Sequence, residues 1–115
     1  MMLVQRSGDM LTASGPGGIN EIQYAALLMM IAAHTGYKAG VFSHMVANEQ
    51  IYDRHMDAAH EMMRRYAIAE ADGDSATPKL ELHPCSNDFY KMTLGDFIIS
   101  NYEPMKPQLK LELGI

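Results

Sequence analysis

The stretch that decides the fold reads Ile22-Gln-Tyr-Ala-Ala-Leu-Leu-Met-Met-Ile-Ala-Ala33. Its apolar residues cover nearly every side of a helical wheel, which is typical of a helix that is buried on all faces. Asn20 precedes the run and is expected to cap the helix, and Gly36 is expected to end it, because glycine adopts the left-handed cap conformation at low cost. The sequence therefore predicts one apolar helix inside the domain.

A second helix is expected at residues 53–71, because the apolar residues Met56, Ala59, Met63 and Tyr66 recur at helical spacing. Alternating segments predict strands at residues 2–6, 40–46, 79–83 and 109–113, a weaker strand at 89–93, and a strand or short turn at 96–104. Residues 12–18 are rich in glycine and predict a loop. We expect one α+β domain over residues 1–115, with a mixed sheet packed by a buried apolar helix and a second amphipathic helix.

Composition narrows the classes of function. The chain has 115 residues, of which 48% are hydrophobic and 20% charged, as in ordinary soluble domains. The formal net charge of -5 argues against nucleic acid as a partner. The longest apolar run, residues 24–33, is too short to span a membrane, and the single cysteine, Cys85, excludes an internal disulfide. These features predict a cytoplasmic protein.

Eleven methionines are many for a chain of this length. Methionine is a flexible side chain that fills gaps, so the first interpretation is a loosely packed core. The alternative is a methionine-rich surface that packs against further sequence. His55 and His60 are five residues apart on the second helix, where their side chains diverge, so a metal pair is not expected.

Several short motifs occur in a fixed order along the chain. Arg6-Ser7-Gly8-Asp9 is followed by Asn20 and Tyr24, and then by Tyr52 and His55. Further along come Pro78-Lys79-Leu80, then Asp96-Phe97, Ile99, Tyr102 and Pro104, and finally Ile115. In order and spacing these motifs resemble the C-terminal half of the thymidylate synthase and pyrimidine-nucleotide hydroxymethylase family. The resemblance covers nearly the whole chain and implies a partial thymidylate synthase-like fold.

The resemblance implies a site for dUMP or a related pyrimidine deoxynucleotide. Arg6 and Ser7 would contact the 5′-phosphate, Asn20 the uracil O4 and N3, and Tyr52 the deoxyribose hydroxyl. A planar guanidinium suits a phosphate, and a carboxamide offers one donor and one acceptor side by side. The substrate-binding residues that it implies are Arg6, Ser7, Gly8, Asp9, Asn20, Gln50 and Tyr52.

The resemblance also implies 5,10-methylenetetrahydrofolate as the one-carbon donor. Asp9 would lie between nucleotide and folate, and the terminal Gly114 and Ile115 would close over the bound pair. The chain departs from the family pattern at two of these places. Gln50 stands where the family commonly has a histidine, and Ile19 replaces the usual phenylalanine on the folate side.

The family's nucleophilic cysteine would lie upstream of Arg6, and Cys85 follows Pro84 in a different context and far downstream. The chain is therefore expected to supply the nucleotide-binding half of a one-carbon transferase, and to be inactive alone. The expected partner is a second copy in a homodimer, or the missing N-terminal half. Two alternatives stay open, namely a fragment of a pyrimidine-nucleotide hydroxymethylase and a non-catalytic nucleotide-binding or interaction module.

Overall fold

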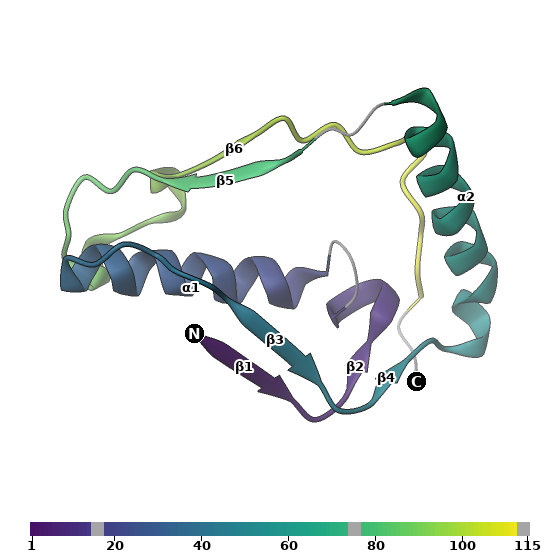
Figure 1. Ribbon diagram of the computed structural model, residues 1–115, viewed down its shortest axis with the longest axis horizontal. Helices are drawn as coiled ribbons and strands as arrows, with labels where there is room; N and C mark the ends of the chain where they lie inside the picture. Colours follow the sequence, from purple (N-terminus) through teal and green to yellow (C-terminus); the bar gives the residue numbers. More distant parts are fainter. Residues whose placement is uncertain (15–17, 74–76, 113–115) are drawn as a thin grey trace.

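The computed structural model describes residues 1–14, 18–73 and 77–112. The chain is an α+β arrangement in which two long helices are joined by short strands (Figure 1). Its radius of gyration is 16.4 Å, whereas a compact domain of about 100 residues has a radius of about 13 Å. The elements are therefore spread more widely than in an ordinary globular domain.

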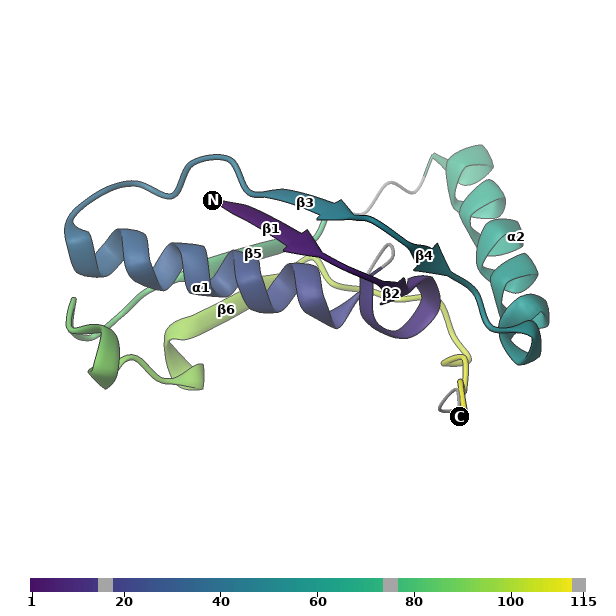
Figure 2. The same cartoon turned by 90° about the horizontal axis from the view of Figure 1, so that it is seen from below.

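Two short parallel ladders lie end to end and form the ribbon that carries the N-terminal motif (Figures 1 and 2). They consist of β1 (Met2–Gln5) with β3 (Ser43–Val46), and of β2 (Gly8–Asp9) with β4 (Glu49–Gln50). Met2 lies opposite Ser43 and Gly8 lies opposite Glu49, so the register is the same in both ladders. Strand β1 confirms residues 2–5 of the strand expected at 2–6, and β3 confirms residues 43–46 of the strand expected at 40–46.

Helix α1 (Ile19–Thr35) is the crossover that parallel pairing of β1 and β3 requires (Figure 2). Gly36 ends it with φ 75° and donates its backbone N–H to the last carbonyls, as predicted. The N-cap is Gly18 rather than Asn20, which lies one residue inside the helix. This correction matters because the side chain of Asn20 does not cap the helix and makes other contacts.

The prediction that α1 is buried on all faces is wrong for the chain by itself. Ala32 is its only buried residue, whereas the side chains of Ile19 and Ile22 are 69% and 52% exposed. The ribbon and strand β5 contact parts of the helix, and these elements are too few to enclose it. The sequence pattern indicates how much apolar surface α1 has, and the described part of this chain covers only a fraction of that surface.

A second helix follows the ribbon as expected. A short 3-10 turn, η2 (Asp53–His55), leads into α2 (Met56–Asp72), and Gly73 ends the helix in the left-handed conformation. No residue of α2 is buried, and Met63 and Tyr66 on its apolar face are 69% and 66% exposed. The helix is amphipathic, but its apolar face is open.

The C-terminal segment runs along α2 and is fastened to it by an arginine (Figure 1). Arg65 donates hydrogen bonds to the carbonyl oxygens of Met105, at 3.2 Å, and Pro107, at 2.8 Å. Hydrogen bonds from Arg64 and Arg65 lower the pKa of Glu61 to about 2, so this carboxylate stays charged and holds Arg65 in place. The segment is therefore tied through its backbone rather than through strand pairing.

The remaining strands form an antiparallel pair, β5 (Lys79–Leu82) with β6 (Phe97–Ser100), on the far side of α1 from the ribbon (Figure 1). The strand expected at residues 79–83 is confirmed, and the ambiguous segment 96–104 contains β6. Between them lie two 3-10 turns, η3 (Phe89–Lys91) and η4 (Leu94–Asp96). Within the described residues the strands thus make three two-stranded sheets rather than one mixed sheet.

Three local predictions need correction. Residues 89–93 form η3 rather than a strand, because Asp88 accepts a hydrogen bond from the backbone N–H of Tyr90 and caps the turn. Residues 109–112 pair with no strand, although Leu109 and Leu111 alternate with exposed neighbours; Leu113 lies outside the described residues. The expected loop begins with the π-helical turn η1 (Met10–Ser14), and residues 15–17 lie outside the described part.

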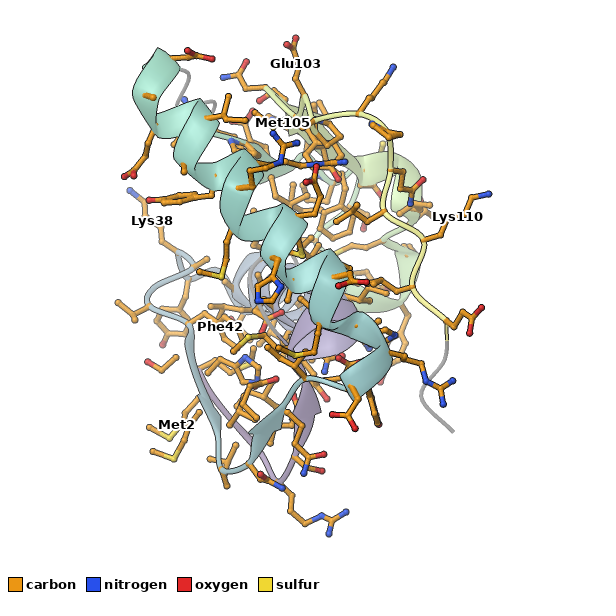
Figure 3. The ribbon with its side chains drawn as sticks, turned by 90° about the vertical axis from the view of Figure 1, so that its right-hand side faces the viewer. Met2, Lys38, Phe42, Glu103, Met105 and Lys110 are labelled. Carbon is orange, nitrogen blue, oxygen red and sulfur yellow. The ribbon has the colours of Figure 1, made fainter. Side chains whose placement is uncertain are left out.

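The methionines occupy the surface more than the interior. Figure 3 shows Met2 at the outer edge, pointing away from the ribbon, where it is 68% exposed. Met45 and Met105 are also exposed, at 58% and 41%. The alternative interpretation, a methionine-rich surface that packs against further sequence, fits these positions better than a loosely packed core.

We predict that Asp96 stabilises the turn before β6 only while it is ionised. Asp96 is buried, and hydrogen bonds from the backbone of Thr93 and then of Cys85 lower its pKa below the ordinary value. Its contribution is complete above the pKa of an unfolded aspartate, about 4, and is lost as the pH falls through the lower pKa of the folded state. Asp96→Asn should lower the melting temperature at pH 7 and reduce its dependence on pH below about 4, as measured by circular dichroism.

Glu103→Gln is the matched control, because it removes a carboxylate from an exposed position on the same side of the chain. If Asp96→Asn and Glu103→Gln shift the melting temperature equally across this pH range, Asp96 has no special role.

Candidate functional site

The first cluster of polar side chains centres on Gln5, the last residue of β1. Its Nε2 donates to the carbonyl oxygen of Ser7 at 2.8 Å, and its Oε1 lies 3.1 Å from both Asn20 Nδ2 and His44 Nε2. The other ring nitrogen of His44, Nδ1, lies 2.8 Å from Glu21 Oε1. One glutamine thus connects the Arg6-Ser7 turn with the first turn of α1 and with β3.

The second cluster centres on Asp9, at the end of β2. Its Oδ1 accepts from the backbone N–H of Leu11 at 3.1 Å, and its Oδ2 accepts from the hydroxyl of Thr12. His55 Nδ1 lies 4.0 Å from the same Oδ2. The ring of Tyr52 meets the ring of His55 edge to face, with centroids 5.6 Å apart. Asp9, expected between nucleotide and folate, and Tyr52, expected at the deoxyribose hydroxyl, therefore share His55 as a neighbour.

His55 joins this cluster to the C-terminal segment. Its side chain is 2% exposed, and its Nε2 lies 2.7 Å from the backbone carbonyl oxygen of Glu112. A carbonyl only accepts, so Nε2 carries a hydrogen. Nδ1 is buried and has no hydrogen-bond partner among the described residues, and Asp9 Oδ2 lies 4.0 Å from it, beyond hydrogen-bond distance. One ring nitrogen of His55 therefore has a partner in the described residues and the other has none.

The residues expected to meet the ends of a nucleotide lie at the surface. Arg6 and Ser7 occupy the turn between β1 and β2, and both are exposed. Gln50 lies opposite Asp9 in the β2–β4 ladder and is exposed, and Tyr52 is 39% exposed. The ribbon therefore brings together residues that are more than forty positions apart in the sequence. Gly114 and Ile115 lie outside the described residues.

Sequence reasoning did not assign a role to Gln5, Glu21 or His44. The signal that could have found them is alternation, because β1 and β3 each show exposed and half-buried residues in turn. Gln5 and His44 occupy half-buried positions, where an apolar residue is usual. A polar residue at an inward position of a strand requires a partner, and here the two residues are partners of each other.

Cys85 has the character of a loop residue. It follows β5, its side chain is exposed, and its backbone N–H donates to Asp96 Oδ1 at 3.2 Å. Within residues 1–14, 18–73 and 77–112, no three His, Cys, Asp or Glu side chains cluster as a metal site would require. In the same residues neither helix has the length and apolar character of a membrane span.

An open apolar cavity of about 440 Å³ adjoins the Asp9 cluster, between η1 and α2. Its lining consists of Met10, Leu11, Ile51, Ala59, Met62, Met63 and Tyr66. The Asp9 cluster thus lies beside an apolar wall formed by η1 and α2. Such a combination is typical of a site for a small organic molecule that carries charge at one end.

The class that the fold defines is an α+β protein whose polar clusters lie beside an apolar cavity. Comparison with known proteins specifies the family. A sequence model of thymidylate synthase matches residues 1–115. Thymidylate synthase of Streptococcus pyogenes serotype M5 (strain Manfredo) is 43% identical over 114 residues, and that of serotype M12 (strain MGAS2096) is 42% identical over 114 residues. The chain belongs to the thymidylate synthase family.

Each of these alignments includes 98% of this chain and 38% of the relative. The chain thus spans well under half the length of the curated relatives that it matches.

We predict that His55 holds the C-terminal segment against the Asp9 cluster. His55→Phe keeps a ring in the pocket but leaves the carbonyl of Glu112 without its donor, which should cost about 1 kcal/mol in the free energy of unfolding. Hydrogen exchange followed by mass spectrometry should show faster exchange in residues 107–112, with α2 unchanged.

His60→Phe is the matched control, because His60 is an exposed histidine on α2. Equal exchange in residues 107–112 for the two variants would contradict a fastening role for His55.

Proposed function

We propose that this chain forms the dUMP-binding part of a thymidylate synthase, an enzyme that transfers a one-carbon unit to C5 of the nucleotide. The observation that carries the proposal is the double contact of Gln5. Gln5 forms hydrogen bonds with the Ser7 carbonyl and the Asn20 carboxamide. It therefore holds the residue expected at the phosphate and the residue expected at the base in fixed positions relative to each other.

The contacts follow from the chemistry of each side chain. The exposed guanidinium of Arg6 and the hydroxyl of Ser7 bind the 5′-phosphate, with a fixed fork of donors for the charge and one neutral donor beside it. Tyr52 holds the deoxyribose hydroxyl, and its ring is steadied edge-on by His55. Gln50 donates to the same hydroxyl through its amide. The backbone of Gly8, which donates to Asn48 at 3.0 Å, fixes the turn that separates these contacts.

Asp9 is the residue that fits the folate. Its carboxylate accepts from Leu11 and Thr12, and a carboxylate has about four lone-pair positions, so it keeps capacity for a pterin N–H. When bound, 5,10-methylenetetrahydrofolate supplies the one-carbon unit and then a hydride. The chain's own contribution is to orient the two ligands and, with Gly114 and Ile115, to exclude water from them.

The nucleophile of the reaction is not assigned to this chain. Addition to C6 of the pyrimidine requires a thiolate, and Cys85 lies in the loop after β5, with nothing cationic among its described contacts. The nucleophile would therefore come from the remaining half of the family's fold, because a second copy of this chain carries only the same Cys85. The open apolar faces of α1 and α2 support such a partner, because large exposed apolar patches are rare in monomers.

We predict that Asn20 selects the base. Asn20→Asp exchanges one polar contact to uracil for an unpaired one, so the preference for dUMP over dCMP should shrink or reverse by about 1–3 kcal/mol. Arg6→Ala should weaken both nucleotides equally, because a phosphate carries no information about the base. Isothermal calorimetry of both nucleotides with each protein measures this.

Asn87→Asp is the charge-matched control, since Asn87 is exposed in the loop after Cys85. Equal affinities for dUMP and dCMP in the parent, unchanged by Asn20→Asp, would remove the proposed base contact.

We predict that the purified chain self-associates and does not release tritium from 5-tritiated dUMP in the presence of folate. Light scattering should report a mass above that of a monomer. Ile22→Glu should reduce the association, because Ile22 is 52% exposed on α1, whereas Gln23→Glu adds the same charge at an exposed polar position beside it. A stable monomer at high concentration, or clear tritium release, would count against the need for a partner.

A further inference from the structure

The donor and acceptor roles around Gln5 fix the position of one proton. Gln5 Nε2 donates to the carbonyl oxygen of Ser7, so the amide oxygen faces Asn20 and His44. A carbonyl oxygen only accepts, and Asn20 supplies an N–H to it. His44 Nε2, which lies 3.1 Å from the same oxygen, must therefore carry a hydrogen as well.

The opposite side of the ring fixes a second proton. His44 Nδ1 lies 2.8 Å from Glu21 Oε1. With its hydrogen on Nε2, a neutral imidazole would direct a lone pair from Nδ1 at a carboxylate lone pair, and the two would repel. A hydrogen must lie between these atoms, either on the ring or on the carboxyl group. The pair of His44 and Glu21 thus holds one proton more than a neutral imidazole and a carboxylate would.

The pair is largely shielded from water. The side chain of His44 is 10% exposed, and Glu21 Oε2 is buried without a hydrogen-bond partner among the described residues. His44 Nδ1 is the group that contacts the carboxyl group of Glu21. The other contacts of the ring are neutral, namely Gln5 on β1 and the stacked ring of Phe42.

We propose that His44 and Glu21 act through Gln5 as positioning residues that fix which way the carboxamide of Asn20 points. A carboxamide that can rotate by half a turn matches uracil in one orientation and cytosine in the other, because the two bases reverse donor and acceptor at these atoms. The bond from Asn20 Nδ2 to Gln5 prevents that rotation. Selectivity for the base then comes from the restraint as well as from Asn20 itself.

The contacts of the ring carry this restraint. Without a hydrogen on His44 Nε2, Gln5 Oε1 loses one of its two donors, and the orientation of Asn20 is held less firmly. This consequence for selectivity rests on the proposed function of Asn20, whereas the proton count does not.

Glu21→Gln provides a sharp test. The new amide can donate to His44 Nδ1, which lets a neutral ring keep its hydrogen on Nε2 and still donate to Gln5. The restraint should therefore survive in this variant with one proton fewer. Gln5→Met has nearly the same shape but neither donor nor acceptor, so it should remove the restraint.

Nitrogen NMR of the ligand-free chain measures the proton count directly. We expect both ring nitrogens of His44 to carry hydrogens in the parent at neutral pH, or Nε2 alone if the second hydrogen lies on Glu21, and Nε2 alone in Glu21→Gln. The side-chain amide of Asn20 should exchange slowly in these two proteins and rapidly in Gln5→Met. A hydrogen on Nδ1 alone in the parent, or equally rapid exchange of the amide in all three proteins, would overturn the proposal.

Calorimetry completes the test. We expect Gln5→Met to reduce the dUMP-to-dCMP affinity ratio about tenfold, the effect of one hydrogen bond. Glu21→Gln should keep the ratio of the parent, whereas His44→Phe, which keeps a ring but cannot donate to Gln5, should lower it. An unchanged ratio in His44→Phe overturns the link between the pair and selectivity. A parent that binds neither nucleotide, yet shows the expected ring hydrogens, contradicts the proposed function and supports the proton pair.

Discussion

Parallel pairing of β1 with β3 is the interaction on which the rest of the structure depends. Two parallel strands cannot be joined by a tight turn, so the chain must cross from the end of one to the start of the other. Helix α1 makes this crossover, and its path back beside the ribbon places the first turn of the helix next to Gln5. Because the register continues into β2 and β4, the same pairing sets Asp9 opposite Gln50. Both polar clusters are products of this one pairing.

The two helices carry more apolar surface than the rest of the described chain covers, which explains why their apolar faces are exposed. Burial of apolar area is the main favourable term in folding, and α1 carries enough of it to be covered on all sides. In this chain the ribbon and the β5–β6 pair reach only parts of it, and Ala32 alone is fully covered. The curated relatives are considerably longer than this chain, which aligns with 38% of their length. The excess apolar surface and the shared family therefore point to the same interpretation, a piece of a larger packed unit.

The sequence predicted most of the elements and little of their packing. Helix ends are local, so Gly36 and Gly73 could be recognised from the conformational freedom of glycine. Burial depends on what lies opposite, and the apolar pattern of α1 could not reveal that its partners are mostly absent from the described chain. The strand prediction for residues 109–112 was wrong for the same reason. An alternating pattern indicates the two faces of a strand, but it does not indicate whether a neighbouring strand is present to pair with it.

For the candidate site, the motif residues were visible in the sequence, but the residues that orient them were not. A guanidinium or a carboxamide in a spaced motif suggests a ligand by its own chemistry. The role of Gln5, Glu21 and His44 depends instead on the hydrogen bonds that connect these three residues in the folded chain. Their relation spans α1, β1 and β3, and no local pattern connects positions so far apart. His55 is similar, because its spacing from His60 argued only against a metal pair and gave no hint of Glu112.

The two groups of residues also differ in exposure, and this difference has a physical reason. Arg6, Ser7, Gln50 and Tyr52 are exposed, so their polar groups are hydrated until a ligand displaces the water. Gln5, Glu21, His44 and His55 are half-buried or buried and already hold partners within the chain. A buried group that is paired keeps its orientation at no further cost when a ligand arrives, and a contact that is oriented in advance loses less entropy on binding. Contacts within the chain therefore hold Asn20 and Asp9 in fixed directions. Under the proposed function, the exposed side chains would adjust around a nucleotide that meets these fixed groups.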